Sequence, residues 1–209
     1  MVPSIVNILT FTSITFAPPL KFMQKYLFNK FSSICISGLA TLIVEGVSTI
    51  KDTFVVFDIE TTGFSATENN IIEIGAVKIT DGEIVDNFST FVNPKEPIPY
   101  RIEKLTGIND SMVADAPFIN DALTQFRSFC EGAVYVAHNA SFDMGFLMEK
   151  ERVSGIEREY SYVDTLGLSR LLVPEISKFK LDNLCKFFKI SLENHHRAVD
   201  DAEATAGIF

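Results

Sequence analysis

Residues 53–60 read TFVVFDIE, a short run of β-branched and aromatic residues that predicts a buried strand. Successive side chains of a strand point to opposite faces, so one face carries Phe54, Val56, Asp58 and Glu60. Two carboxylates therefore end an otherwise apolar row. A strand end that emerges into solvent is the ordinary explanation for such a pair.

The turn after this strand makes the two carboxylates more informative. Thr61, Thr62 and Gly63 follow directly and predict a tight turn with free hydroxyls and backbone N–H groups. Such groups beside two acids suit a nucleotide or a phosphate. The strand end is therefore a candidate binding site.

The rest of the chain predicts an α/β fold. Further strands are expected at residues 71–79, 84–92, 133–137 and 160–163, the first two joined by the hairpin signal Asp81-Gly82. Prolines 94, 97 and 99 mark a loop, and helices are expected at residues 118–130, 141–153, 165–172, 181–188 and from Ala198. A meander followed by alternating strands and helices predicts a mixed five-stranded sheet, antiparallel then parallel, with helices on both faces.

The first fifty residues differ from the rest. They carry three lysines and one acid, begin with an uncharged stretch interrupted by polar residues and Pro18-Pro19, and lack a basic start. This composition is a poor transmembrane span and a poor signal peptide. We expect residues 1–50 to be a weakly ordered appendage of unknown role, ahead of one domain at 51–209. A membrane or targeting role is the alternative.

Composition limits the class of protein. An apolar fraction of 47% in 209 residues fits one packed domain. Three separated cysteines favour a reducing compartment, here the cytoplasm, and with only three histidines they exclude a Cys/His metal cage. A metal would need carboxylates. The net charge of −9 argues against a protein that coats DNA through counterion release.

Asp143 is a third unusual carboxylate. It lies on the helix expected at 141–153, where Phe146 and Leu147 follow at the i+3 and i+4 positions, so it faces the body of the protein. A buried carboxylate is costly unless it is paired with a cation. An acid that only favours the positive end of the helix dipole is the alternative.

Residues 195–201 read HHRAVDD, in which His195/Asp200 and His196/Asp201 have the same spacing. The helix face separates the two pairs. Asp201 shares a stripe with the small and apolar Ala204, Thr205 and Ile208, whereas Asp200 shares one with Glu203 and Gly207. We therefore predict that Asp201 points inward beside His196, and that His195 is solvated or a neighbour of the site.

Four converging carboxylates with a histidine predict a particular chemistry. Like charges raise one another's pKa, and oxygen-ligand cations such as Mg²⁺ or Mn²⁺ compensate them. Two such ions can flank a phosphodiester, with His196 as the general base for an attacking water. The sequence places no serine or cysteine beside a base, so it does not suggest a covalent intermediate.

Three segments together resemble a known family. FDIETTG at 57–63, HNASFD at 138–143 and HRAVDDAEAT at 196–205 resemble the three motifs of the DEDDh (DnaQ-like) 3′–5′ exonucleases. The proofreading module of PolC-type bacterial DNA polymerase III alpha chains is the most similar member. The resemblance covers the chain from Thr53 to its end, and the three motifs in this order and spacing are highly specific.

The resemblance implies a ribonuclease-H-like fold and a two-metal exonuclease. Its metal ligands would be Asp58, Glu60, Asp143 and Asp201, with His196 as the base. Residues that contact the 3′-terminal nucleotide would be Thr61, Thr62, Phe64, Leu105 and Asn139, although Phe64 is equally explained as a hydrophobe beside a turn. The family's last helix usually continues further beyond Asp201, so we expect a truncated helix and low stability.

Three functions remain open at this point. The first is a metal-dependent exonuclease on single-stranded DNA 3′ ends, acting in proofreading beside a replicative polymerase. The second is an RNA 3′-end trimming enzyme of the same family, because 2′-OH contacts are not visible in a sequence. The third is a non-catalytic module that binds nucleic-acid ends or docks on a polymerase.

Overall fold

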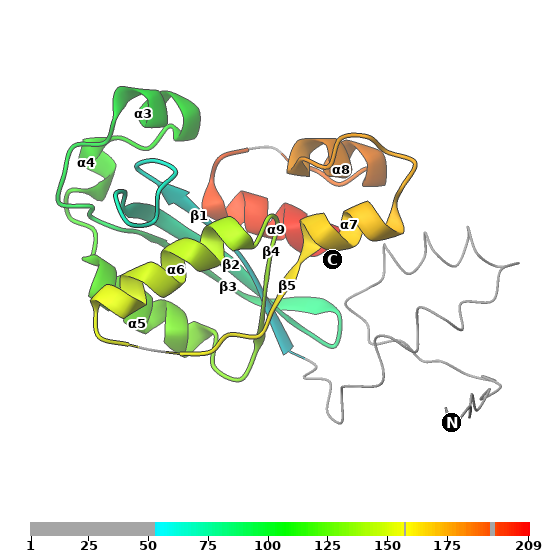
Figure 1. Cartoon of the computed structure of the whole chain (residues 1–209), viewed down its shortest axis with the longest axis horizontal. Helices are drawn as coiled ribbons and strands as arrows, with labels where there is room; N and C mark the ends of the chain where they lie inside the picture. The colour runs from blue at the N-terminus through cyan, green and yellow to red at the C-terminus, as the bar shows by residue number, and fades with distance from the viewer. Residues whose placement is uncertain (1–52, 157, 193–194) are drawn as a thin grey trace, which may run out of the picture.

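The computed structural model describes residues 53–156, 158–192 and 195–209, so the predictions made for residues 1–50 lie outside the described residues. A five-stranded sheet forms its centre (Figure 1), with strands β1 (Thr53–Thr61), β2 (Ile71–Thr80), β3 (Glu83–Phe91), β4 (Val134–Ala137) and β5 (Tyr162–Asp164). Their spatial order is β3-β2-β1-β4-β5. The first three strands are antiparallel, whereas β4 and β5 run parallel to β1. The predicted mixed sheet is confirmed.

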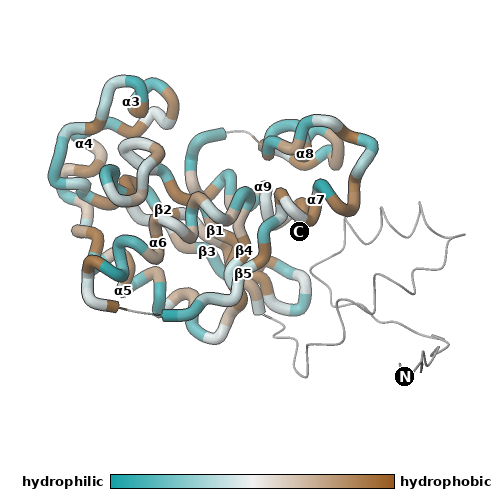
Figure 2. The backbone as a smooth tube through the Cα atoms, viewed as in Figure 1, coloured by the Kyte–Doolittle hydropathy of each residue, from teal (hydrophilic) through white to brown (hydrophobic). Residues whose placement is uncertain are grey.

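Helices cover both faces of this sheet. The helices are α3 (Tyr100–Thr106), α4 (Asp110–Val113), α5 (Ile119–Phe129), α6 (Ser141–Val153), α7 (Thr165–Leu172), α8 (Leu181–Phe188) and α9 (Ala198–Ile208). On one face, Phe57 of β1 is buried with Phe126 of α5 and Phe146 of α6. On the other face α9 packs against β1 and β2, and apolar residues gather along the central strands (Figure 2). The alternation of β1 therefore divides its side chains between two cores.

The end of the chain is part of the second core. Phe209 is buried, and its ring meets the edge of Phe54 on β1 with 5.1 Å between centroids. On its outer side, α9 contacts Leu184 and Cys185 of α8 through Ala204 and Ile208. These contacts hold α9 against the sheet and so fix the residues in its first turn.

The loop marked by the three prolines is present, and two short helices that the sequence analysis did not predict, α3 and α4, follow it. Leu105 lies in the last turn of α3, and Gly107 ends that helix with a left-handed φ of 72°. Asn109 caps α4 through its side chain. Ile102 and Ile108 are buried in a small cluster that includes Ile72 of β2. Pro99 thus stands at the N-cap of α3, and α3 and α4 together pack against Ile72 of β2.

Gly75 of β2 sets how closely α9 can approach. A Cβ atom at this position would lie 2.1 Å from the backbone nitrogen of Val199 and 2.2 Å from the carbonyl carbon of Ala198. Only a residue without a side chain allows this contact. This close approach places the first turn of α9 directly against β2, the strand that pairs with β1.

Replacing Gly75 with alanine is expected to lower the free energy of unfolding by about 3 kcal/mol, because backbone atoms of α9 must move. Urea denaturation measures the change. Gly145→Ala is the matched control, since a Cβ atom there meets nothing within 4 Å in the interior of α6 and should stabilise by up to ~1 kcal/mol. Equal effects of the two substitutions would contradict the close packing of α9.

Candidate active site

The predicted site residues meet at one end of the sheet. Asp58 and Glu60 come from β1, Asp143 from the first turn of α6, and Asp201 from the first turn of α9. They line a single cavity of about 260 Å³ together with His196 and other residues of the three motifs. Segments separated by more than a hundred residues therefore converge, as the sequence analysis expected.

Three of the four carboxylates form a compact group. Asp58, Glu60 and Asp201 each offer an oxygen, and these oxygens lie within 4.8 Å of one another. Alternation along β1 puts the first two on the face covered by α9, and the helix stripe brings the third to them. Asp201 is 4% exposed and Asp200 is half-buried, in agreement with the predicted stripe.

Asp143 reaches the group from the other side of β1. It is buried, and its Oδ1 accepts a hydrogen bond from the backbone N–H of Ile59 at 3.2 Å. The pairing of β4 with β1 ends at Val56. The N–H of Ile59 therefore lies beyond the hydrogen bonds between these two strands, and it takes a side-chain oxygen as its acceptor. The bond fixes Asp143 next to Asp58.

The electrostatics of this cluster are unfavourable for four ionised acids. Burial, followed by repulsion from Asp143 and the other carboxylates, raises the pKa of Asp58 well above its usual value. Burial and repulsion from Asp201 raise the pKa of Glu60 to about 8, although the Arg197 guanidinium lowers it in part. Burial likewise raises the pKa of Asp143 to about 8. The folded protein therefore disfavours full ionisation of these acids, because the Arg197 guanidinium compensates their charge only in part.

This donor set fits a divalent cation. Hard carboxylate oxygens are the ligands that Mg²⁺ and Mn²⁺ prefer. A cation also stabilises the ionised form of closely spaced acids, which otherwise repel one another. Asp58, Glu60 and Asp201 could hold one ion directly, and the adjacent Asp143 could join them.

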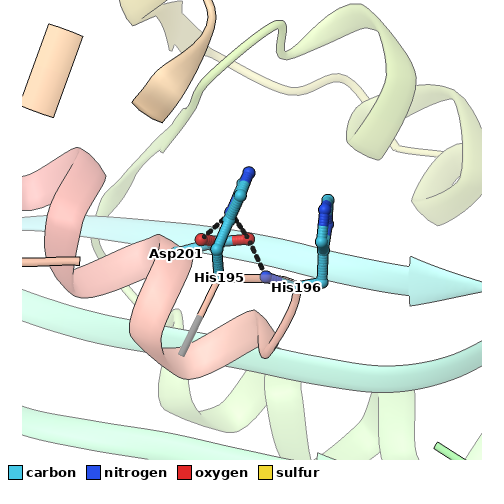
Figure 3. A group of neighbouring side chains, drawn as sticks. All are labelled: His195, His196 and Asp201. Atoms are coloured by element: carbon cyan, nitrogen blue, oxygen red, sulfur yellow. Dashed lines mark hydrogen bonds and ion pairs between the residues drawn. The ribbon is translucent and has the colours of Figure 1, made fainter. Parts of the chain in front are cut away.

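The two histidines approach Asp201 differently (Figure 3). Nδ1 of His195 lies 2.8 Å from Oδ1 of Asp201, whereas His196 donates its backbone N–H to Oδ2 at 3.1 Å. The rings stack with 4.0 Å between centroids. His196 has a left-handed φ of 71°, which turns the chain so that the preceding ring falls on Asp201. His195 is thus a direct neighbour of the carboxylate, and both rings line the cavity.

Burial and the neighbouring His195 lower the pKa of the His196 imidazole. The neutral ring therefore persists to more acidic pH than in a free histidine. A neutral imidazole at the edge of a carboxylate cluster can accept a proton from water.

The threonines of the turn after β1 have different surroundings. Thr61 is buried and lines the cavity, and its hydroxyl donates to the carbonyl of Gly63 at 2.6 Å. Thr62 does not line the cavity. Its hydroxyl donates to Glu96 at 3.2 Å and accepts from the backbone N–H of Asn70 at 2.9 Å. The two hydroxyls that the sequence analysis expected to be free therefore hold the turn in place.

Phe64, Leu105 and Asn139 also line the cavity. Phe64 is 73% exposed at the tip of the turn, with the Arg101 guanidinium 5.7 Å from its ring centroid. Leu105 is exposed on α3. Asn139 has a left-handed φ of 62° just before α6. The exposed ring of Phe64 can stack on a base, and the apolar side chain of Leu105 can pack against one.

Sequence reasoning missed three residues that hold the site together. Asp164 caps α7 and accepts from the backbone N–H groups of Asn139 and Ala140 at 2.9 and 3.2 Å. His138 lies 2.9 Å from both the Thr165 hydroxyl and the Phe179 carbonyl oxygen. Glu73 is fully buried on β2. An acid within the apolar run 71–79 is the same signal that drew attention to Asp58.

The comparisons with known proteins agree with this geometry. The family model described as Exonuclease (RNase_T) matches residues 55–209. The chain belongs to this exonuclease family. It is similar to the PolC-type DNA polymerase III of Caldanaerobacter subterraneus subsp. tengcongensis, with 52% identity over 172 residues covering 82% of this chain and 12% of that protein. The PolC-type polymerase of Clostridium perfringens is 54% identical over 158 residues, covering 76% and 11%. The chain therefore spans about a tenth of the length of these relatives.

Solved structures extend the likeness to the fold. Exonuclease X in complex with 5′ overhanging duplex DNA is 34% identical with a TM-score of 0.62, covering 74% of this chain and 87% of that one. The nuclease domain of 3′hExo, a DEDDh family member bound to rAMP, has a TM-score of 0.65 at 18% identity, covering 77% and 90%. The family resemblance and the ribonuclease-H-like fold are confirmed.

Within the described residues, no helix has the length and apolar character to cross a membrane.

Metal affinity should depend on pH, because the ion displaces protons from Glu60 and Asp143, whose pKa values are both raised to about 8. We expect the affinity for Mn²⁺ to rise roughly tenfold or more between pH 6 and pH 8. Calorimetric titration in two buffers of different ionisation enthalpy measures affinity and proton release together. A constant affinity with no proton release would contradict the raised pKa values.

Proposed function

We propose that this chain is a divalent-metal-dependent 3′–5′ exonuclease that releases nucleoside monophosphates from single-stranded DNA ends. The observation that supports this proposal most is the approach of Asp58, Glu60 and Asp201 to within 4.8 Å, with the buried Asp143 beside them. Membership of the exonuclease family points the same way.

The proposed roles follow from the position of each side chain. Asp58, Glu60, Asp143 and Asp201 would hold two Mg²⁺ or Mn²⁺ ions. When bound, the ions would stabilise the negative charge that develops on the phosphodiester and make the attacking water more acidic. His196, with its lowered pKa, accepts the proton from that water. His195 keeps Asp201 oriented through its Nδ1 contact.

The mouth of the cavity would receive the 3′-terminal nucleotide. Phe64 and Leu105 would stack on the terminal base and separate it from the next one, because both are exposed at the entrance. Asn139 would position the strand. Thr61 and Thr62 would act mainly through the shape of their turn, since their hydroxyls have partners within the protein.

The polymerase relatives suggest a proofreading context. The matched relatives are PolC-type DNA polymerases of which this chain spans about a tenth, so residues 51–209 would form the exonuclease domain that acts beside a replicative polymerase. In that context the chain would work in the bacterial cytoplasm. Residues 1–50 are proposed as an appendage outside this domain.

The purified protein should shorten a 5′-labelled single-stranded DNA stepwise from its 3′ end in the presence of Mn²⁺ or Mg²⁺, and EDTA should stop the reaction. Denaturing gels of timed samples show the ladder. An RNA oligomer of the same sequence, assayed in parallel, distinguishes the trimming enzyme from the deoxyribonuclease. Intact DNA and RNA in the presence of folded protein would refute the proposal and favour a binding module.

A pair of adjacent substitutions gives this assay its control. Asp201→Asn removes a ligand and should lower the rate more than about 100-fold, since even loss of an outer partner of a metal ligand costs 10–100-fold. Asp200→Asn changes the neighbouring carboxylate, which is outside the ligand group, and should keep most of the activity. The reverse pattern would show that the assigned ligand is wrong.

A further inference from the structure

Glu73 is a fifth acid near the carboxylate cluster, and it differs from the others in forming an ion pair with a guanidinium, that of Arg197. It lies directly opposite Glu60 in the register of β1 and β2 and is 0% exposed. Oε1 accepts from Nη2 of Arg197 at 2.8 Å and from Nε at 3.2 Å. Oε2 accepts from the backbone N–H of Ala198 at 3.1 Å.

The bond to Ala198 supplies a cap that α9 lacks. Among the described residues, Arg197 stands at the N-cap position of α9 and makes no capping bond with its side chain. The first N–H groups of a helix need an acceptor, and a carboxylate there also interacts favourably with the helix dipole. Glu73 provides both from a strand 124–125 residues earlier in the chain.

Fixed contacts lie on both sides of the proposed base in the chain, and the Glu73–Arg197 pair is the one that follows it. His196 precedes Arg197 and has the left-handed φ of 71°, a conformation that its surroundings must impose. Before it, the Nδ1 atom of His195 contacts Asp201, and after it the Arg197 guanidinium is fixed on Glu73 and lies 5.3 Å from the Phe91 ring centroid. The contact of Gly75 with Ala198 and Val199 prevents the helix start from shifting along β2.

We propose that Glu73 and Arg197 form a positioning clamp that holds His196 and the start of α9 in register with the carboxylates of β1. Neither residue touches the reacting atoms. Glu73 would not be a metal ligand, because it does not line the cavity and the Arg197 guanidinium already compensates its charge. This inference rests on the proposed function, which it deepens by assigning what sets the geometry of the base.

The clamp requires a planar two-pronged cation at position 197. A lysine can place one charge near Glu73 but cannot donate from both Nε and Nη2 in one plane. Arg197→Lys should therefore recover only part of what Arg197→Ala loses. A guanidinium ion added to the Arg197→Ala protein can reoccupy the site beside Glu73.

The experiment compares Glu73→Gln, Arg197→Ala and Arg197→Lys with the wild-type chain at a temperature where all are folded. We expect kcat to fall by about 10- to 100-fold in the first two variants, with KM for a DNA oligomer little changed. Methylguanidinium should raise kcat of Arg197→Ala and leave Glu73→Gln unaffected. A simple loss of stability would lower the apparent kcat through a smaller folded fraction, but it would not respond to the added cation in only one variant.

A second readout needs neither metal nor substrate. Amide hydrogen exchange of Ala198, followed by NMR, should be on the order of tenfold faster in Glu73→Gln, because its acceptor has lost its charge. Arg152→Ala is the matched control, since Arg152 makes an exposed two-pronged bond to Glu149 on α6. It should change neither kcat nor the exchange of Ala198.

The outcomes separate this inference from the proposed function. Wild-type protein that is folded but inactive refutes the proposed function, and the exchange of Ala198 then tests the clamp alone. Active wild-type protein with unchanged kcat in Glu73→Gln and Arg197→Ala would overturn the clamp and leave the exonuclease proposal intact. Loss of activity without rescue by methylguanidinium, together with unchanged exchange of Ala198, would also overturn it.

Discussion

Repulsion among buried carboxylates at the end of β1 is the constraint on which the rest of this structure depends. Asp58, Glu60, Asp143 and Asp201 come together where burial raises the pKa values of the first three, and repulsion within the group adds to the shifts of Asp58 and Glu60. A fold selected for stability alone would separate these charges. Under the proposed function, a divalent ion would supply the positive charge that compensates these carboxylates and would make their convergence favourable.

The architecture holds this unfavourable group together with ordinary packing. Strand β1 pairs with β4 at Phe54–Val56 and with β2 as far as Thr61, so β2 holds the end of β1 beside the cluster. Asp143 is fixed by the N–H of Ile59, and α9 is held by its close contact with Gly75 and by Phe209 against Phe54. The left-handed conformations of Asn139 and His196 are maintained in the same way, by contacts to Asp164 and Asp201. Strain and repulsion are concentrated at the site, and the packed core compensates for them.

The sequence was sufficient for the sheet, the motifs and the inward direction of Asp201, because alternation and helix stripes are local patterns. Helices α6, α7 and α8 have the predicted bounds. The helices α3 and α4 were missed because seven and four residues show too little periodicity. The occupied hydroxyl of Thr62 and the pairing of Glu73 with Arg197 depend on partners 34 and 124 residues away, which no local pattern reveals. His195 was expected to be solvated or a neighbour of the site, and it is an exposed residue whose Nδ1 contacts Asp201; that specific contact depends on the left-handed turn at His196, which is a backbone conformation and not a residue pattern.

The most direct test of the central claim is the calorimetric unfolding temperature of wild-type protein and Asp58→Asn, each with and without Mn²⁺ near pH 8. Groups whose folded pKa is raised stabilise the protein at low pH, and they lose this contribution as pH rises through the folded pKa. Removing one carboxylate should therefore stabilise the metal-free protein, and Mn²⁺ should reverse the order by stabilising the wild type more. An Asp58→Asn protein that is less stable in both conditions, or a wild type that Mn²⁺ does not stabilise, would contradict the account.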